Sequence, residues 1–115
     1  LYEYLDKLIE IHDQNPQPMK EVCFTSNMNT PPHYFEKFLE YLPKLQKHFR
    51  VIIQASGENI GEELEYVRSG VVYNRWKENI EYFLKNTTVD IHFMPTLNLL
   101  SIPGLMRYLE YWEEL

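Results

Sequence analysis

Residues 51–70 read "VIIQASGENIGEELEYVRSG" and change within a few positions from an unbroken apolar run to Gln, Ser, Glu and two glycines. The β-branched run predicts a buried strand over Arg50–Ala55, because such residues pack well in a pleated sheet. The polar residues after it either form an ordinary turn or are presented to a ligand. The neighbouring elements of the chain are needed to choose between these two interpretations.

Two further strands are predicted, one on each side of this stretch. Glu21–Thr25 forms the first, and its contiguous apolar residues Val22–Phe24 favour burial on both faces. Thr88–Met94 forms the third strand along the chain, after Arg50–Ala55, and its alternation of apolar with polar residues predicts one partly polar face.

Helices are predicted before the first strand and between the strands, where apolar residues recur at helical spacing. The first begins near Leu1 and ends before the prolines of residues 15–18, because proline lacks a backbone N–H. The second has Thr30 as its cap and Pro31 at its first position, where a missing N–H costs nothing. Pro43 is expected to kink or restart this helix.

Two more helices complete the pattern. One is predicted from Val72 to near Asn86, between the second and third strands. The last begins near Pro103, after the third strand. Its inner side is predicted to consist of three residues: Leu105, Leu109 and Trp112.

The alternation of helices and strands predicts an α/β fold of parallel βα units with right-handed crossovers, because each connection is too long for a hairpin. Parallel strands place their carboxyl ends at one edge, where ligands bind in sheets and barrels of this class. The three strand exits are polar and lie at residues 25–27, 54–58 and 94–98. The sequence therefore predicts a polar pocket at this edge, although turn and cap residues would give a similar pattern.

The composition of the 115-residue chain fits a single domain and limits its partners. Hydrophobic residues make up 44% of the chain, and the net charge of −6 argues against binding to nucleic acid. No run of about 18 apolar residues is present to span a membrane. The single cysteine, Cys23, forms no internal disulfide, which favours a reducing, cytoplasmic setting. Leu1 and Leu115 both fall inside helical patterns, so both ends are expected to be truncated.

Several familiar sites are absent from the sequence. The exit at residues 54–61 has neither G-x-G-x-x-G nor G-x-x-x-x-G-K-[ST], which argues against a nucleoside triphosphate site. The 4 histidines are not spaced as metal ligands. Glu62, Glu63 and Glu65 are explained by the charge preference of a first helical turn and by a solvated face.

The exit of the second strand also resembles a known family. Residues 56–62, "SGENIGE", with "EYVR" at 65–68 and Gly70, resemble the fourth-strand exit of radical S-adenosylmethionine (radical SAM) enzymes, in the branch with a C-terminal twitch or SPASM auxiliary domain. Three more segments are similar to neighbouring parts of that branch: 24–30 ("FTSNMNT"), 73–80 ("YNRWKENI") and 94–105 ("MPTLNLLSIPGL"). The resemblance implies that residues 1–115 form roughly the third to fifth strands of a partial (β/α)6 TIM-like barrel.

The resemblance further implies that the parent enzyme binds S-adenosylmethionine against a [4Fe-4S] cluster and generates a 5'-deoxyadenosyl radical, which takes a hydrogen atom from a substrate. Ser56 would hydrogen-bond the cofactor, and Arg68 would pair with its carboxylate. Five other residues would line the same cavity: Glu58, Thr25, Asn27, Thr96 and Asn98. The resemblance does not specify the substrate, for which a peptide is one candidate.

The chain departs from the family pattern at two places. The family's S-[IL]-D-G becomes "SGEN" at residues 56–59, so the acidic residue is the longer Glu58 and the shape of the loop changes. The C-x-x-x-C-x-x-C loop that holds the cluster and the G-G-E segment are expected upstream of Leu1. Cys23 does not replace them.

Other roles stay open for these residues. Ser56 would serve equally as a helix cap, and Arg68 would form a surface ion pair with Glu65, one helical turn earlier. The whole chain would then be an α/β binding module without a cofactor, whose strand exits are ordinary caps and turns. A flavodoxin-like nucleotide domain is a third alternative.

Overall fold

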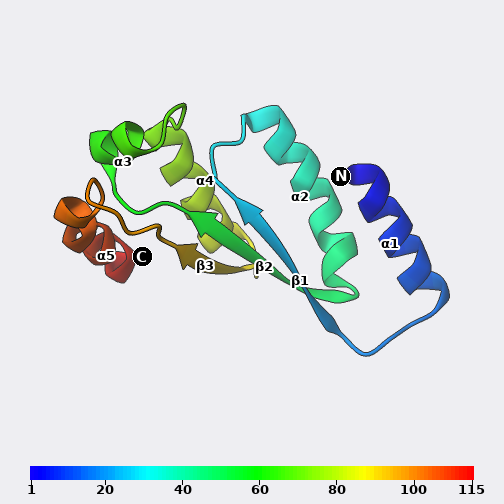
Figure 1. Ribbon diagram of the computed structural model, residues 1–115. Coiled ribbons are helices and arrows are strands. Elements are labelled where there is room, and N and C mark those ends of the chain that lie inside the picture. Colours follow the sequence, from blue (N-terminus) through cyan, green and yellow to red (C-terminus); the bar gives the residue numbers. More distant parts are fainter.

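The computed structural model describes residues 1–115 and contains five α-helices, one short 3-10 helix and three β-strands (Figure 1). In chain order the elements are α1 (Tyr2–Gln14), β1 (Lys20–Ser26), α2 (Pro32–Gln46), β2 (Phe49–Ser56), α3 (Gly61–Val67), α4 (Tyr73–Asn86), β3 (Asp90–Met94), η1 (Ile102–Gly104) and α5 (Leu105–Glu114). This order confirms the predicted alternation of helices and strands. The third strand begins at Asp90, two residues later than predicted.

The three strands form one parallel sheet in the order β1-β2-β3. Val22 of β1 pairs with Val51 of β2, and Ile53 of β2 pairs with Ile91 of β3. The parallel direction confirms the predicted α/β class. It also places the carboxyl ends of all three strands at one edge of the sheet.

One face of the sheet packs against the helices. Phe24 of β1 meets Phe38 of α2 edge to face, with ring centroids 5.3 Å apart. On the same face, at the opposite edge of the sheet, Phe93 of β3 stacks on Trp112 of α5. Between them, β2 contributes alternate residues that are all buried in the hydrophobic core: Phe49, Val51, Ile53 and Ala55.

The opposite face, which we call the bare face, carries the side chains that alternate with those of the core. Its members are Glu21, Cys23, Thr25, Arg50, Ile52, Gln54, Ser56, Asp90, His92 and Met94. At its amino-terminal end, Arg50 joins all three strands, with Nη1 3.1 Å from the Glu21 carboxylate and Nε 2.6 Å from that of Asp90. Ile52 is buried on this face but does not belong to the core cluster.

The prediction that β1 is buried on both faces is wrong. Cys23, in the middle of its apolar run, is exposed, whereas Val22 and Phe24 pack toward the core. β1 is an edge strand with one bare face, and a contiguous apolar run does not distinguish this case from full burial. The partly polar face predicted for β3 is confirmed, because His92 is exposed while Phe93 packs inward.

Two predictions about the helices are wrong, one for α2 and one for α5. The N-cap residue of α2 is Pro31 rather than Thr30, and no side chain caps the helix. The helix continues through Pro43 and does not restart there. In α5, Leu105 and Trp112 pack against the core as predicted, but Leu109 is 48% exposed, and Tyr108, 1% exposed, is buried in its place.

The helices complete an elongated molecule of 50 × 27 × 24 Å, with α1 and α5 at its two ends (Figure 1). α4 supplies the centre of the helical layer through Trp76, Ile80 and Phe83, all of which are buried. None of the helices combines the length and the apolar character that crossing a bilayer requires.

We expect Ile53→Ala to lower the free energy of unfolding by about 3 kcal/mol, because it leaves a cavity in the core. The neighbouring substitution Ile52→Ala should cost clearly less, since Ile52 lies outside the core on the bare face. Urea denaturation of the two variants measures the difference. Equal losses would contradict a sheet that is covered on one face only.

Candidate functional site

The three polar strand exits lie side by side at the carboxyl edge of the sheet. Ser26 pairs with Ala55, and Ser56 pairs with Met94, so the strands end at nearly the same level. Thr96 follows Met94 by two residues and is exposed. The exits predicted from the sequence therefore share one edge.

On the bare face of this edge, polar side chains from neighbouring strands point the same way. The Thr25 hydroxyl of β1 donates a hydrogen bond to Oε1 of Gln54 on β2, at 3.0 Å. Ser56 follows Gln54 by two residues on the same strand, and it is half-buried. The only hydrogen bond of Ser56 outside the sheet ladder is made by its carbonyl oxygen, so its hydroxyl is free to bind a ligand.

Trp76 of α4 holds the exit of β2 from the core side. Its indole Nε1 donates to the carbonyl oxygen of Ser56 at 3.1 Å. A Cβ atom on Gly57 would lie 2.9 Å from Cζ2 of the same indole, so a larger residue would displace one of the two. Trp76 is itself 1% exposed and packs against Trp112 and Tyr73. The indole therefore fixes the position of the Ser56 backbone.

A buried ion pair shapes the loop that follows Gly57. Arg68, at the end of α3, donates to both carboxylate oxygens of Glu58, with Nε at 3.0 Å from each and Nη2 at 2.9 Å from Oε2. Glu58 is 2% exposed, and Arg68 replaces part of the hydration that its carboxylate loses on burial. The bidentate geometry is the strong form of a charge-assisted hydrogen bond. The Nε and Nη2 side of the Arg68 guanidinium is therefore engaged within the protein.

Side-chain amides tie the exit loops to one another. Asn29, after β1, donates to the Gly70 carbonyl at 2.8 Å and accepts from the Val72 N–H at 3.0 Å. Asn59, after β2, donates to the Ser101 carbonyl at 2.9 Å. The first amide joins the β1–α2 loop to the α3–α4 connection, and the second joins the β2–α3 loop to the segment after β3. The carboxyl edge is thus one connected rim.

Tyr108 of α5 lies close to the ion pair of Glu58 and Arg68. Burial raises the pKa of the Tyr108 phenol to about 12, and the Glu58 carboxylate acts in the same direction. The phenol is therefore neutral at physiological pH. Two buried oxygen atoms of the same region, Oδ1 of Asn59 and Oε2 of Glu63, accept no hydrogen bond.

The other predicted site residues take part in the turns of their own loops. The side chain of Asn27 accepts from the Asn29 N–H at 3.0 Å. The side chain of Asn98 accepts from a backbone N–H two residues later at 2.8 Å. The Thr96 carbonyl accepts from the Ser101 hydroxyl at 3.2 Å. The structure thus brings Thr25 and Ser56 onto the bare face, whereas the other predicted residues lie in the loops beyond it.

Both structural alternatives considered for Ser56 and Arg68 are wrong. Ser56 does not cap α3, because the N-cap residue of that helix is Ile60. Arg68 does not pair with Glu65, whose carboxylate instead accepts from the Tyr73 N–H at 2.9 Å.

Sequence reasoning missed two residues that build the rim: Asn29 and Trp76. Gln54 lies in the predicted polar exit at residues 54–58, and its place on the bare face follows from strand alternation with Ile53. The contacts of Asn29 and Trp76 join residues 41 and 20 positions apart in the sequence, respectively. No local sequence pattern indicates contacts between residues so far apart.

The residues of this chain do not fit an iron–sulfur cluster. No group of three or more His, Cys, Asp or Glu side chains is placed to hold a metal ion. A [4Fe-4S] cluster requires several cysteine thiolates, and the one cysteine here, Cys23, is exposed on the bare face. The rim offers hydroxyl and amide groups, which suit an organic ligand.

Comparison with known proteins adds nothing to this geometry. The chain matches no protein-family model, no curated protein and no solved structure. A function must therefore be argued from the residues of the rim and from the sequence.

We expect Gly57→Ala to lower the free energy of unfolding by about 2 kcal/mol, because the new methyl group meets the Trp76 ring. In a Trp76→Phe background the same substitution should cost much less, since the part of the ring that meets the methyl group is gone. Urea denaturation of the four proteins forms a double-mutant cycle. A coupling energy near zero would show that the indole does not constrain Gly57.

Arg68→Met should lower the free energy of unfolding by about 3 kcal/mol, because it leaves the buried Glu58 carboxylate without a partner. Adding Glu58→Gln should recover most of this loss, since the amide carries no charge. Lys47→Met is the control, because Lys47 pairs with Asp13 where both side chains are largely exposed, and it should cost less than about 1 kcal/mol. Equal losses for the Arg68 and Lys47 variants would contradict the buried pair.

Proposed function

We propose that this chain is the third-to-fifth-strand part of a radical SAM enzyme and that the carboxyl edge of its bare face binds S-adenosylmethionine. The observation that carries the proposal is the order of three consecutive parallel strands with one face covered by helices and the other bare. A partial (β/α)6 barrel has the same arrangement, with the bare face turned toward its interior. Ligands of such barrels bind at the carboxyl ends of the strands.

Ser56 is the residue to which we assign direct contact with the cofactor. It ends the central strand, it lies on the bare face, and its hydroxyl is free. The Trp76 indole holds its backbone in place, so the hydroxyl is presented from a fixed position. A hydroxyl of this kind suits hydrogen bonding to the ribose or to the methionyl group of S-adenosylmethionine.

The ion pair of Arg68 with Glu58 leads us to a different role for Arg68 than the one implied by the resemblance. Arg68 is committed to the buried Glu58 through Nε and Nη2, and separating this pair is unfavourable, so only the N–H groups pointing away from Glu58 would remain for the cofactor carboxylate. We therefore assign Arg68 and Glu58 to positioning the loop after Ser56. Thr25 stays a candidate contact on the bare face, and Asn27, Thr96 and Asn98 stay candidates in the loops around it.

The cluster ligands belong, in this proposal, to a C-x-x-x-C-x-x-C loop upstream of Leu1. A cluster held there would supply the electron for reductive cleavage of S-adenosylmethionine, the chemistry that the resemblance implies. In this proposal, the role of residues 1–115 is to orient the cofactor at the strand exits. Its substrate is not assigned, and a peptide is one candidate.

A cofactor-free α/β binding module is the second candidate function. It is favoured by the internal hydrogen bonds of Asn27 and Asn98 and by the closed pair of Arg68 and Glu58, because groups satisfied within the protein need no ligand. The two proposals differ most clearly at Ser56, whose free hydroxyl only the first one uses.

The test uses the full-length product of the gene, purified and reconstituted with iron and sulfide without oxygen. We expect a C-x-x-x-C-x-x-C motif before residue 1 and release of 5'-deoxyadenosine from S-adenosylmethionine. Ser56→Ala should weaken binding of S-adenosylmethionine about tenfold through the loss of one hydrogen bond. Ser69→Ala is the matched control, because Ser69 is exposed after α3.

The outcomes separate the two candidates. A full-length protein without the cysteine motif, or without 5'-deoxyadenosine release, would favour the binding module. A protein that is active but insensitive to Ser56→Ala would retain the family and move the cofactor contact away from Ser56.

A further inference from the structure

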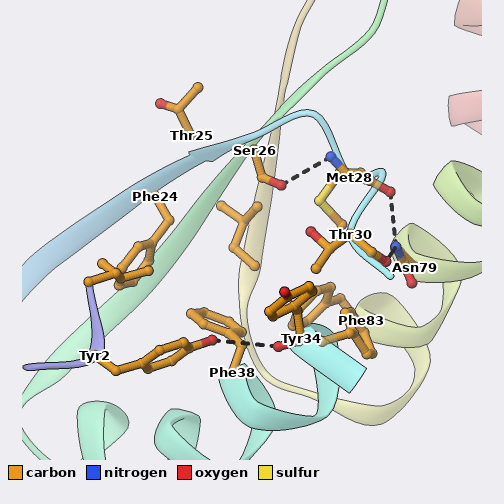
Figure 2. A pocket seen from close by; sticks show the side chains of 13 residues that line it. Tyr2, Phe24, Thr25, Ser26, Met28, Thr30, Tyr34, Phe38, Asn79 and Phe83 are labelled. Carbon is orange, nitrogen blue, oxygen red and sulfur yellow. Dashed lines mark hydrogen bonds between the residues drawn. The ribbon is translucent and has the colours of Figure 1, made fainter. Parts of the chain in front are cut away.

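A cavity of about 230 Å³ lies on the helix-covered side of the sheet, beneath the carboxyl end of β1 (Figure 2). Strands β1 and β2 border it on one side, and α2 and α4 border it on the other. Tyr2, at the start of α1, closes part of its edge. Thr25 lies at its border, but Figure 2 shows the Thr25 side chain pointing away from it, and Ser56, on the opposite face of the sheet, does not line it. The cavity is therefore separate from the cofactor site proposed above.

Aromatic rings form most of the cavity wall. Phe35 and Phe38 of α2 both meet Phe83 of α4 edge to face, with ring centroids 5.0 and 6.0 Å apart. Phe24 of β1 meets Phe38 in the same way, and Ile53 of β2 completes this side. Edge-to-face contacts hold the rings in defined orientations, and they leave ring faces free to stack on a ligand.

Hydroxyl and amide groups gather at one end of the cavity, and among Thr25, Ser26, Thr30 and Asn79 only the Thr30 side chain makes no hydrogen bond. Asn79 of α4 donates to the carbonyl oxygens of Met28 and Thr30 at 2.9 and 3.2 Å, and so pins the loop that carries both residues. The Ser26 hydroxyl accepts from the Met28 N–H at 3.0 Å. The Thr30 side chain makes no hydrogen bond, and it lies between Ser26 and the aromatic rings in Figure 2. Thr30 is thus the group available to a polar substituent.

Tyr2 is held at the edge of the cavity by its own contacts. Its hydroxyl lies 3.5 Å from the Tyr34 carbonyl, to which it donates. Lys37 Nζ lies 4.4 Å from the centroid of the Tyr2 ring, and the Tyr41 ring centroid lies 4.9 Å from it. A cation over the ring and a neighbouring aromatic group both restrain Tyr2, so the cavity keeps a defined edge.

We propose that this cavity binds a small aromatic molecule with one hydrogen-bonding substituent, such as phenol or indole, whose substituent meets the Thr30 hydroxyl. Size supports this class, because an apolar protein cavity of about 150 Å³ is sufficient for benzene. The larger volume here leaves room for a substituent or a second ring. The aromatic wall and the uncharged polar side chains at one end select against charged ligands.

Phenol and benzene are the probes, measured by isothermal titration calorimetry on the 115-residue chain. Both should bind to the unaltered protein. Thr30→Val removes the hydroxyl with little change in shape, and it should weaken phenol binding about tenfold while leaving benzene binding unchanged. Thr88→Val is the matched control, because Thr88 is an exposed threonine that does not line this cavity, and it should change neither affinity.

A third variant, Ile53→Phe, fills the cavity and should abolish the binding of both probes. The proposal is overturned if neither probe binds to the unaltered protein, or if a folded Ile53→Phe variant still binds them. It is also overturned if Thr30→Val leaves the affinity for phenol unchanged. Should Ile53→Phe fail to fold, the Thr30→Val comparison decides the matter alone.

Discussion

The structure depends on β2, which pairs in parallel with a neighbour on each of its two edges. Because consecutive strands lie next to one another and run the same way, each connection must return along the sheet before the next strand begins. The helices of these connections pack against one face, where Ile53 and Ala55 are buried. Gln54 and Ser56 of the same strand consequently point to the other face, which is left bare.

At the rim, this geometry separates residues that hold the loops from residues that face outward. Trp76 fixes the Ser56 backbone from the core side, and Arg68 compensates the buried charge of Glu58. Such contacts matter because a carboxylate without a partner is strongly disfavoured when buried. The hydroxyl of Ser56 takes no part in them. A polar strand exit thus contains side chains that hold the loops in place and a hydroxyl that can contact a ligand. Only the contacts within the folded protein distinguish these two kinds of residue.

Most of the fold was predictable from the sequence, whereas only part of the candidate site was. The order of elements follows from apolar spacing and from prolines, which act locally along the chain. The prediction that both faces of β1 are buried is wrong at Cys23, which is exposed. An apolar run indicates a strand, but it does not show whether that strand lies at the edge of the sheet. For the site, the sequence placed Ser56 at the correct edge, but it did not reveal that Arg68 is paired with Glu58.

By itself, the sequence determined which segments are strands and helices, that the strands are parallel, and that their polar exits share one edge. These properties depend on residue type and on spacing over a few positions. The tertiary structure alone decided which face of the sheet is covered, that Trp76 lies under Gly57, and that aromatic side chains from β1, α2 and α4 enclose a cavity. The physical reason is that these contacts join residues far apart in the chain, whose meeting depends on how the helices pack.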